Sequence, residues 1–214
     1  MDAYTRPICS LAKSLGTIGV AERGRYVWHE DEKYVRFLAE FFLRRSNRTT
    51  VQRFLPSFIE AFPTFEALAS AEPDSVVKVA WWAGLRRRVA KLPVIAATFL
   101  SRETWTAEEL LSLPHVGRYA AEGIALYVLG EPTFPVDNNV RRVVGRYLGI
   151  DSEAGLGEAV RALVDIALRQ GDFENLRDVH RGALALGWES CRTKPACGTC
   201  SLRDSCAYGS GVAE

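Results

Sequence analysis

The stretch Leu113-Pro114-His115-Val116-Gly117-Arg118-Tyr119-Ala120-Ala121 decides the fold expected for this chain. Pro114 ends one helix, and Gly117 permits a tight backbone path before the next helix begins. The first turn of a helix presents free backbone N–H groups, which can hold a DNA phosphate without reading the base sequence. An ordinary helix–helix connection has the same pattern. The stretch therefore predicts a helical hairpin and leaves its function open.

The regions on both sides of this turn have the apolar period of helices. Apolar residues recur at steps of three and four, and no stretch alternates as a strand does. The expected helices span 33–44, 50–62, 65–70, 73–82, 86–101 with a kink or restart at Pro93, a helix capped by Thr106 and Glu109 that ends near Leu113, 117–129, 138–148, 153–170 and 174–187. We therefore predict an all-α fold.

Length and composition exclude several classes of protein. The 214 residues are 48% apolar and 25% charged, which excludes a disordered chain and suggests one large domain or two small lobes. The formal net charge is +1, so a nucleic-acid surface would have to come from local clusters of basic residues. We find neither a run of 18 apolar residues nor a signal peptide, and we expect a cytoplasmic protein.

Four of the five cysteines lie close together near the C-terminus. Cys191, Cys197, Cys200 and Cys206 follow the pattern C-x5-C-x2-C-x5-C. Disulfides within so small a loop would cross-link little of the chain, and zinc sites usually pair two C-x2-C knuckles where this loop has one. Four thiolates along one loop can instead surround an iron–sulfur cubane. The spacing favours iron–sulfur over zinc or plain structural thiols.

Asp137 follows the hairpin by 20 residues and precedes the predicted helix 138–148. An aspartate at such a place is most often a helix N-cap. The alternative is an acid at the mouth of a cleft between two lobes. One helix and one loop separate it from Gly117, so the hairpin and the acid can flank one groove.

Hairpin, acid and four-cysteine loop, in this order, resemble the helix-hairpin-helix DNA glycosylase superfamily. This superfamily (HhH-GPD) includes endonuclease III, MutY-type adenine glycosylases and mismatch-specific thymine/uracil glycosylases. The resemblance runs from about Tyr26 to Cys206. It implies a six-helix barrel domain with the helix-hairpin-helix at 30–131, a discontinuous iron–sulfur cluster domain made of 1–29 and 132–214, and a DNA-binding cleft between these two helical lobes.

Three features select a branch of the superfamily. Tyr119 stands where the bifunctional enzymes carry a lysine that forms a Schiff base, so the resemblance implies base excision without strong lyase activity. Glu40 and the following Leu43-Arg44-Arg45 run resemble the thymine-mismatch type, although adenine glycosylases share the glutamate. The chain also ends eight residues after Cys206, without the extra domain usual in adenine enzymes.

The resemblance implies a monofunctional glycosylase of base excision repair that flips out thymine or uracil opposite guanine. The alternatives are a MutY-like adenine glycosylase acting opposite guanine or 8-oxoguanine, a non-catalytic DNA-binding protein on the same scaffold, and a zinc-stabilised helical module with no role on DNA. The expected partner is double-stranded DNA with a mismatched or damaged base, and we expect a monomer.

The resemblance also assigns site residues. Asp137, Tyr119 and Glu40 are the expected catalytic residues. DNA contacts are expected from Arg44, Arg45, His115, Gly117, Arg118 and Arg141, with Arg142 and Arg146 as further candidates for phosphate. The four clustered cysteines would hold a 4Fe-4S cluster, and the backbone carbonyls of Leu111, Leu113 and Val116 would hold a monovalent cation.

Two positions depart from the family pattern. His115 replaces the usual first glycine of the hairpin, and the first cysteine gap has five residues where six are usual. A side chain at 115 can alter the grip on phosphate or on the cation. The shorter gap requires a tighter cluster loop.

Overall fold

The computed structural model describes residues 5–29, 32–44, 46–84, 86–171 and 173–211. These residues form α-helices, short 3₁₀ turns and one π-helical turn, with no strand among them, so the all-α fold class is confirmed. The chain divides into two compact units. One consists of Met1–Arg23 and Phe134–Glu214, and the other of Gly24–Thr133. The family resemblance implies boundaries after residues 29 and 131.

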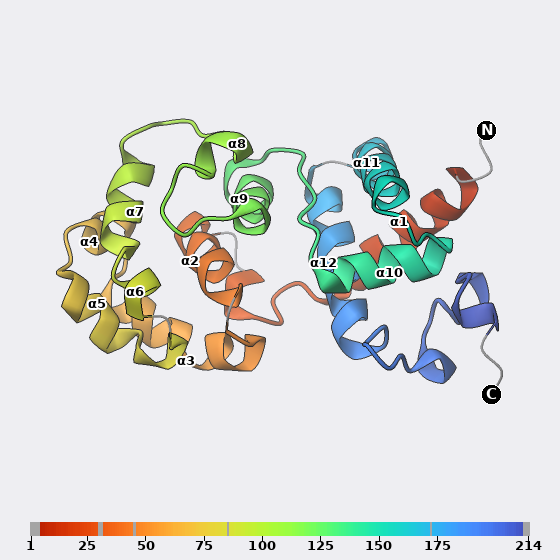
Figure 1. The fold of residues 1–214 in the computed structure, drawn as a ribbon, viewed down its shortest axis with the longest axis horizontal. Coiled ribbons are helices and arrows are strands. Elements are labelled where there is room, and N and C mark those ends of the chain that lie inside the picture. The colour runs from red at the N-terminus through yellow and green to blue at the C-terminus, as the bar shows by residue number, and fades with distance from the viewer. Residues whose placement is uncertain (1–4, 30–31, 45, 85, 172, 212–214) are drawn as a thin grey trace. The chain divides into compact units, whose positions relative to one another are not determined.

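The unit Gly24–Thr133 is built around α2 (Lys33–Leu43), which packs against α3, α9 and the π-helical turn η3. Its other elements are η1 (Val27–His29), α3 (Arg48–Ala61), α4 (Phe65–Ala69), α5 (Pro73–Val79), η2 (Trp81–Ala83), α6 (Arg86–Val89), α7 (Leu92–Leu100), α8 (Ala107–Leu110), α9 (Arg118–Ile124) and η3 (Ala125–Leu129). Figure 1 colours this unit from orange to green.

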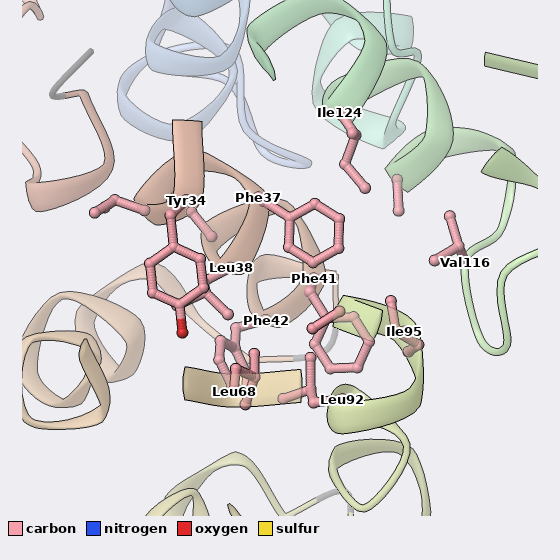
Figure 2. Packing of buried hydrophobic residues seen from close by; sticks show 14 of the residues in the cluster. Tyr34, Phe37, Leu38, Phe41, Phe42, Leu68, Leu92, Ile95, Val116 and Ile124 are labelled. Atoms are coloured by element: carbon pink, nitrogen blue, oxygen red, sulfur yellow. The ribbon is translucent and has the colours of Figure 1, made fainter. Parts of the chain in front are cut away.

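The core of this unit follows from the apolar period of α2. Phe37, Phe41 and Phe42 are at most 1% exposed, and Figure 2 shows them among side chains from α4, α7 and α9. The Phe37 ring meets the edge of Phe65 at 5.0 Å, and the rings of Phe41 and Phe42 meet at 5.5 Å. Burying each such ring contributes about 1.5–3 kcal/mol, so this cluster fixes α2 as the central helix.

Capping and proline signals set the helix boundaries in this unit largely as expected. Thr64 caps α4 by accepting the Ala67 N–H, and Thr106 and Glu109 form both halves of a capping box on α8. The expected helix 86–101 is interrupted before Pro93 and restarts as α7. The helix expected to run to Leu113 is shorter and ends at Leu110.

The other unit consists of α1 (Thr5–Ala21), α10 (Asn138–Leu148), α11 (Glu153–Gln170) and α12 (Phe173–Glu189), followed by η4 (Cys197–Thr199), η5 (Arg203–Ser205) and η6 (Gly209–Gly211). Helix α1, red in Figure 1, packs along α12. A Cβ on Gly19 would lie 1.9 Å from the Asp178 carbonyl oxygen, and one on Gly182 would lie 2.0 Å from that of Leu15. Only glycine permits this close crossing.

The sequence did not predict α1, because glycine within a helix lowers its propensity and the reason for the glycines is a tertiary contact. None of the helices in the described ranges is long and apolar enough to cross a membrane.

Candidate active site and nucleic-acid interface

The hairpin between α8 and α9 has the short turn that the sequence predicts, but its strained residue is His115. His115 has φ +61°, in the left-handed region that favours glycine, and it is exposed. Gly117 has φ −97° and ψ 173°, an extended conformation that any residue adopts. The conformational reason that we expected for Gly117 is therefore wrong. Leu113 and Val116 are buried, and the Val116 N–H donates to the Leu113 carbonyl at 3.2 Å.

Gly117 is required for a close approach by Arg44. A Cβ on Gly117 would lie 2.5 Å from Nη1 of Arg44 and 3.1 Å from its Cζ. Arg44 is exposed and caps the C-terminus of α2. The guanidinium of Arg44 therefore lies beside the glycine at which α9 begins. Arg45 lies outside the described residues.

Glu40 lies on α2 one turn before Arg44 and contacts the same partner helix. A Cβ on Gly123 of α9 would lie 2.3 Å from Glu40 Oε2 and 2.8 Å from its Cδ. Tyr119 precedes Gly123 by one turn, so these two residues share a face of α9. Tyr119 is partly buried. The packing of α2 on α9 thus gathers Glu40, Arg44, Gly117 and Tyr119, which the sequence had singled out separately.

Glu122 is a titratable group on α9 that the sequence reasoning missed. Burial raises the pKa of this carboxyl, and Arg118 partly offsets the effect. Arg118 Nη1 lies 3.8 Å from Glu122 Oε1, and its side chain is 72% exposed. So exposed a guanidinium remains available to a phosphate, because an ion pair at this distance in water is weak.

Asp137 caps the N-terminus of α10. Its Oδ1 accepts the N–H groups of Asn139 and Val140, both at 2.8 Å, and its Oδ2 accepts Nδ2 of Asn139 at 2.6 Å. The side chain is partly exposed. The positive end of the helix favours a negative charge here, and three hydrogen bonds fix the direction of the carboxylate. Capping and a catalytic role are therefore compatible.

The arginines of α10 differ in the partners that they have. Arg141 is 44% exposed and forms an ion pair with the exposed Glu153. Arg142 donates from Nε to the Cys191 carbonyl at 3.0 Å and from Nη2 to Asn139 Oδ1 at 2.7 Å. Arg142, a candidate for phosphate by sequence, here joins α10 to the segment after α12.

Arg146, and the backbone of Ala207 and Tyr208, hold the cysteine loop against α10. Arg146 donates to the carbonyls of Arg192 at 2.7 Å and Thr193 at 3.2 Å. The N–H groups of Ala207 and Tyr208 donate to the last turn of α10. Arg146 was also a candidate for phosphate, and its contacts give it a structural role in this loop.

The four clustered cysteines have the chemistry of a metal or cluster site. None of them forms a disulfide. Burial raises the pKa of the Cys200 thiol, the Leu202 backbone partly offsets this through a hydrogen bond, and the neighbouring Cys191, Cys206 and Cys197 raise the pKa further. Cys200 is therefore close enough to the other three cysteines to be affected by them. In the described part of the chain, no three His, Cys, Asp or Glu side chains converge on a single metal position. Four free thiols in one loop nevertheless fit the donor set of a cubane cluster.

Comparison with known proteins identifies the class. Residues 39–165 match the family model of HhH-GPD superfamily base excision DNA repair proteins, and the chain belongs to this superfamily. The expected family is therefore confirmed. This chain is 30% identical to the thymine-DNA glycosylase of Aeropyrum pernix over 179 residues, which cover 80% of each protein.

Two further relatives define the neighbouring branches. The chain is 26% identical to the thymine/uracil-DNA glycosylase of Methanothermobacter thermautotrophicus over 97% of its own length and 96% of the relative's. It is 29% identical to the adenine DNA glycosylase of Mycobacterium tuberculosis over 80% of its length, which is 58% of that relative. The solved structure of a thermostable thymine-DNA glycosylase shares the fold, with a TM-score of 0.83, 22% identity, and coverage of 99% of this chain and 100% of that one.

Proposed function

We propose that the protein is a monofunctional DNA glycosylase that removes thymine or uracil paired with guanine. The observation that carries this proposal is the face of α9. It presents the phenol of Tyr119 one turn from Gly123, against which the Glu40 carboxylate lies. A phenol cannot form a Schiff base, so base release is hydrolytic. The two relatives named for thymine, one of them matched over nearly the whole chain, support the choice of base.

The first step is extrusion of the target nucleotide from the duplex. Unstacking and unpairing cost a few kcal/mol, and least for a mismatched pair, so a T:G or U:G wobble is easier to flip than a normal pair. Arg44 and Arg45 fill the gap or contact the orphan guanine, because a guanidinium pairs well with the acceptors of guanine.

Breaking the N-glycosidic bond leaves an oxocarbenium-like sugar, as in glycoside hydrolysis. Asp137 stabilises this cation and activates water, with its carboxylate oriented by Asn139 and Val140. Glu40 orients the water or protonates the leaving base. Tyr119 contributes its hydroxyl and ring at the sugar or base.

The hairpin supplies the grip on the DNA backbone. His115, Gly117 and Arg118 contact phosphate there, and the Arg44 guanidinium adds positive charge beside Gly117. Arg141 binds phosphate by exchanging its ion pair with Glu153, whose side chain is 79% exposed. The carbonyls of Leu111, Leu113 and Val116 would hold a monovalent cation, which would stabilise the turn. Local cations reconcile DNA binding with a net charge of +1.

Cys191, Cys197, Cys200 and Cys206 would hold a 4Fe-4S cluster. Hydrolysis of the glycosidic bond needs no electron transfer, so the bound cluster would have a structural role and would order the basic loop around Arg192 and Lys194. The proximity of Cys200 to the other three thiols supports this assignment. Visible absorbance and iron analysis of freshly purified protein test it, and a colourless protein with stoichiometric zinc would overturn it.

Duplexes carrying T:G, U:G, A:G or A:8-oxoguanine test the proposed function. We expect alkali-labile sites at thymine or uracil opposite guanine, and no strand break before alkali. Breaks before alkali would contradict the role of Tyr119. Duplex binding without release of any base would instead favour a non-catalytic DNA-binding protein.

An adenine glycosylase is the second candidate. The similarity to the adenine enzyme of M. tuberculosis, and the presence of Glu40, favour it. Release of adenine from A:G or A:8-oxoguanine, with T:G left intact, would establish it in place of the first.

A further inference from the structure

His180 of α12 is a buried polar residue that no step above uses. It is 1% exposed, and its Nε2 lies 3.0 Å from the carbonyl oxygen of Pro135. A carbonyl oxygen only accepts, so Nε2 carries the proton and donates it. The edge-to-face contact of the imidazole with the buried Phe134, at 5.0 Å and 89°, fixes the plane of the ring.

The segment that His180 holds leads directly to Asp137. Residues 130–137 belong to no helix, so their backbone depends on outside partners. The two residues at the contact, Phe134 and Pro135, are both buried, and Asp137 follows Pro135 by two positions. Loss of this donor would leave the Pro135 carbonyl without the hydrogen bond from His180. The segment that leads to Asp137 would then be held less firmly.

Helix α12 also holds the chain on the other side of Asp137. A Cβ on Gly187 would lie 2.6 Å from the Cβ of Asn139, so the first turn of α10 packs directly on α12. Asn139 is in turn a donor to both carboxylate oxygens of Asp137. Helix α12 therefore contacts the chain on both sides of Asp137: His180 binds Pro135, before the acid, and Gly187 packs on Asn139, after it.

We infer that His180 is a positioning residue for base excision, which sets the carboxylate of Asp137 through the Pro135 carbonyl. This inference rests on the proposed function. A misplacement of about 1 Å can cost on the order of a hundredfold in rate, so one hydrogen bond two residues from the acid is enough to matter.

The test compares His180→Met with His180→Gln in the full-length protein. The two side chains are similar in size, and only glutamine can donate to the Pro135 carbonyl from about the place of Nε2. For a T:G duplex under single turnover, His180→Met should release base about ten- to a hundredfold more slowly, with duplex affinity within about twofold of the parent. His180→Gln should release base at a rate within about threefold of that of the parent protein. Equal rates for the two variants, or a loss of binding that matches the loss of rate, would overturn the inference.

A second pair covers the case in which His180→Met does not fold. His180→Asn and His180→Gln are both polar amides, but asparagine is one bond too short to reach the carbonyl. Asparagine should be slow and glutamine active, and equal activity would again overturn the inference.

A measurement without catalysis separates this inference from the proposed function. Hydrogen exchange of the Asn139 and Val140 amides reports how firmly Asp137 caps α10. His180→Met, or His180→Asn if the first does not fold, should lower this protection relative to His180→Gln, even if no duplex proves to be a substrate. Unchanged protection would refute the positioning role, whereas lowered protection in a protein inactive on every mismatch would refute only the proposed function.

Discussion

The N-cap residues of helices α9 and α10, Gly117 and Asp137, lie 20 residues apart in the chain, and the two helix N-termini are built in opposite ways. Gly117 provides no side-chain cap, and the guanidinium of Arg44 lies beside it. Asp137 caps its own helix with a carboxylate that accepts three hydrogen bonds. A helix N-terminus attracts negative charge, so the first N-terminus suits the external phosphate that we propose there, whereas the second is already occupied by the carboxylate of Asp137.

Removing the charge of Asp137 is the strongest test of this contrast between the two helix N-termini. Asp137→Asn keeps an oxygen that can cap α10 but carries no negative charge, so folding should be little affected. Single-turnover release of base should fall by about 10²–10³-fold, because in the proposed mechanism this charge stabilises the sugar cation, while duplex affinity stays close to that of the parent.

Asp137→Ser is the matched control, since serine also caps a helix without a charge. It should be as inactive as the asparagine variant and about as stable. Excision by Asp137→Asn at the parent rate would show that Asp137 is only a cap.

The region around Asp137 also contains a buried histidine, His180, whose titration makes the stability of the fold depend on pH. Burial lowers the pKa of His180 to about 4 from an ordinary value of 6.5, although the Pro135 carbonyl and Asp137 oppose the shift. Between these pH values the unfolded chain binds more protons at His180 than the folded chain does. The contribution of the neutral His180 to stability is therefore fully present above pH 6.5 and is lost as pH falls toward 4. The loss of unfolding free energy is about 3 kcal/mol.

Chemical denaturation from pH 7 to pH 4 measures this loss, and His180→Gln separates it from the titration of carboxylates. Between pH 4 and 6.5 the variant should show a shallower slope than the parent. Identical slopes would mean that the pKa of His180 is the same in the folded and the unfolded chain.

The helix caps could be predicted from sequence, because capping depends on neighbouring residues. Asp137 before helix 138–148, and Thr106 with Glu109, are signals carried by neighbouring residues, and both are found as caps. The reason for Gly117 could not be predicted, since it is the approach of Arg44 from another helix. His180 was missed for the same reason: its partner, Pro135, lies 45 residues earlier in the chain.

The hairpin side is tested by its arginine. Arg44→Gln removes a charge beside Gly117, so binding to fully paired duplexes, which offer no orphan guanine, should weaken by a similar factor for all sequences. The slope of log K against log salt should fall by about 1. Fluorescence anisotropy at several salt concentrations measures both quantities.

Arg141→Gln is the matched comparison at the start of α10, because Arg141 is exposed but already paired with Glu153. Its slope should change less than that of Arg44→Gln. If the order were reversed, the phosphate site would belong to α10 and the contrast between the two helix starts would fail.

The smallest expected effect concerns His115, the residue with φ +61° in the hairpin. A non-glycine residue in the left-handed region costs about 1–2 kcal/mol, and glycine removes this cost but adds entropy to the unfolded chain. His115→Gly should therefore raise the free energy of unfolding by up to about 1 kcal/mol, which urea denaturation can measure. His115→Ala keeps the strain and should show no gain. An equal gain in both variants would assign the effect to the imidazole. The backbone at the N-terminus of α9 would then be no more strained than the backbone at the N-terminus of α10, which Asp137 caps.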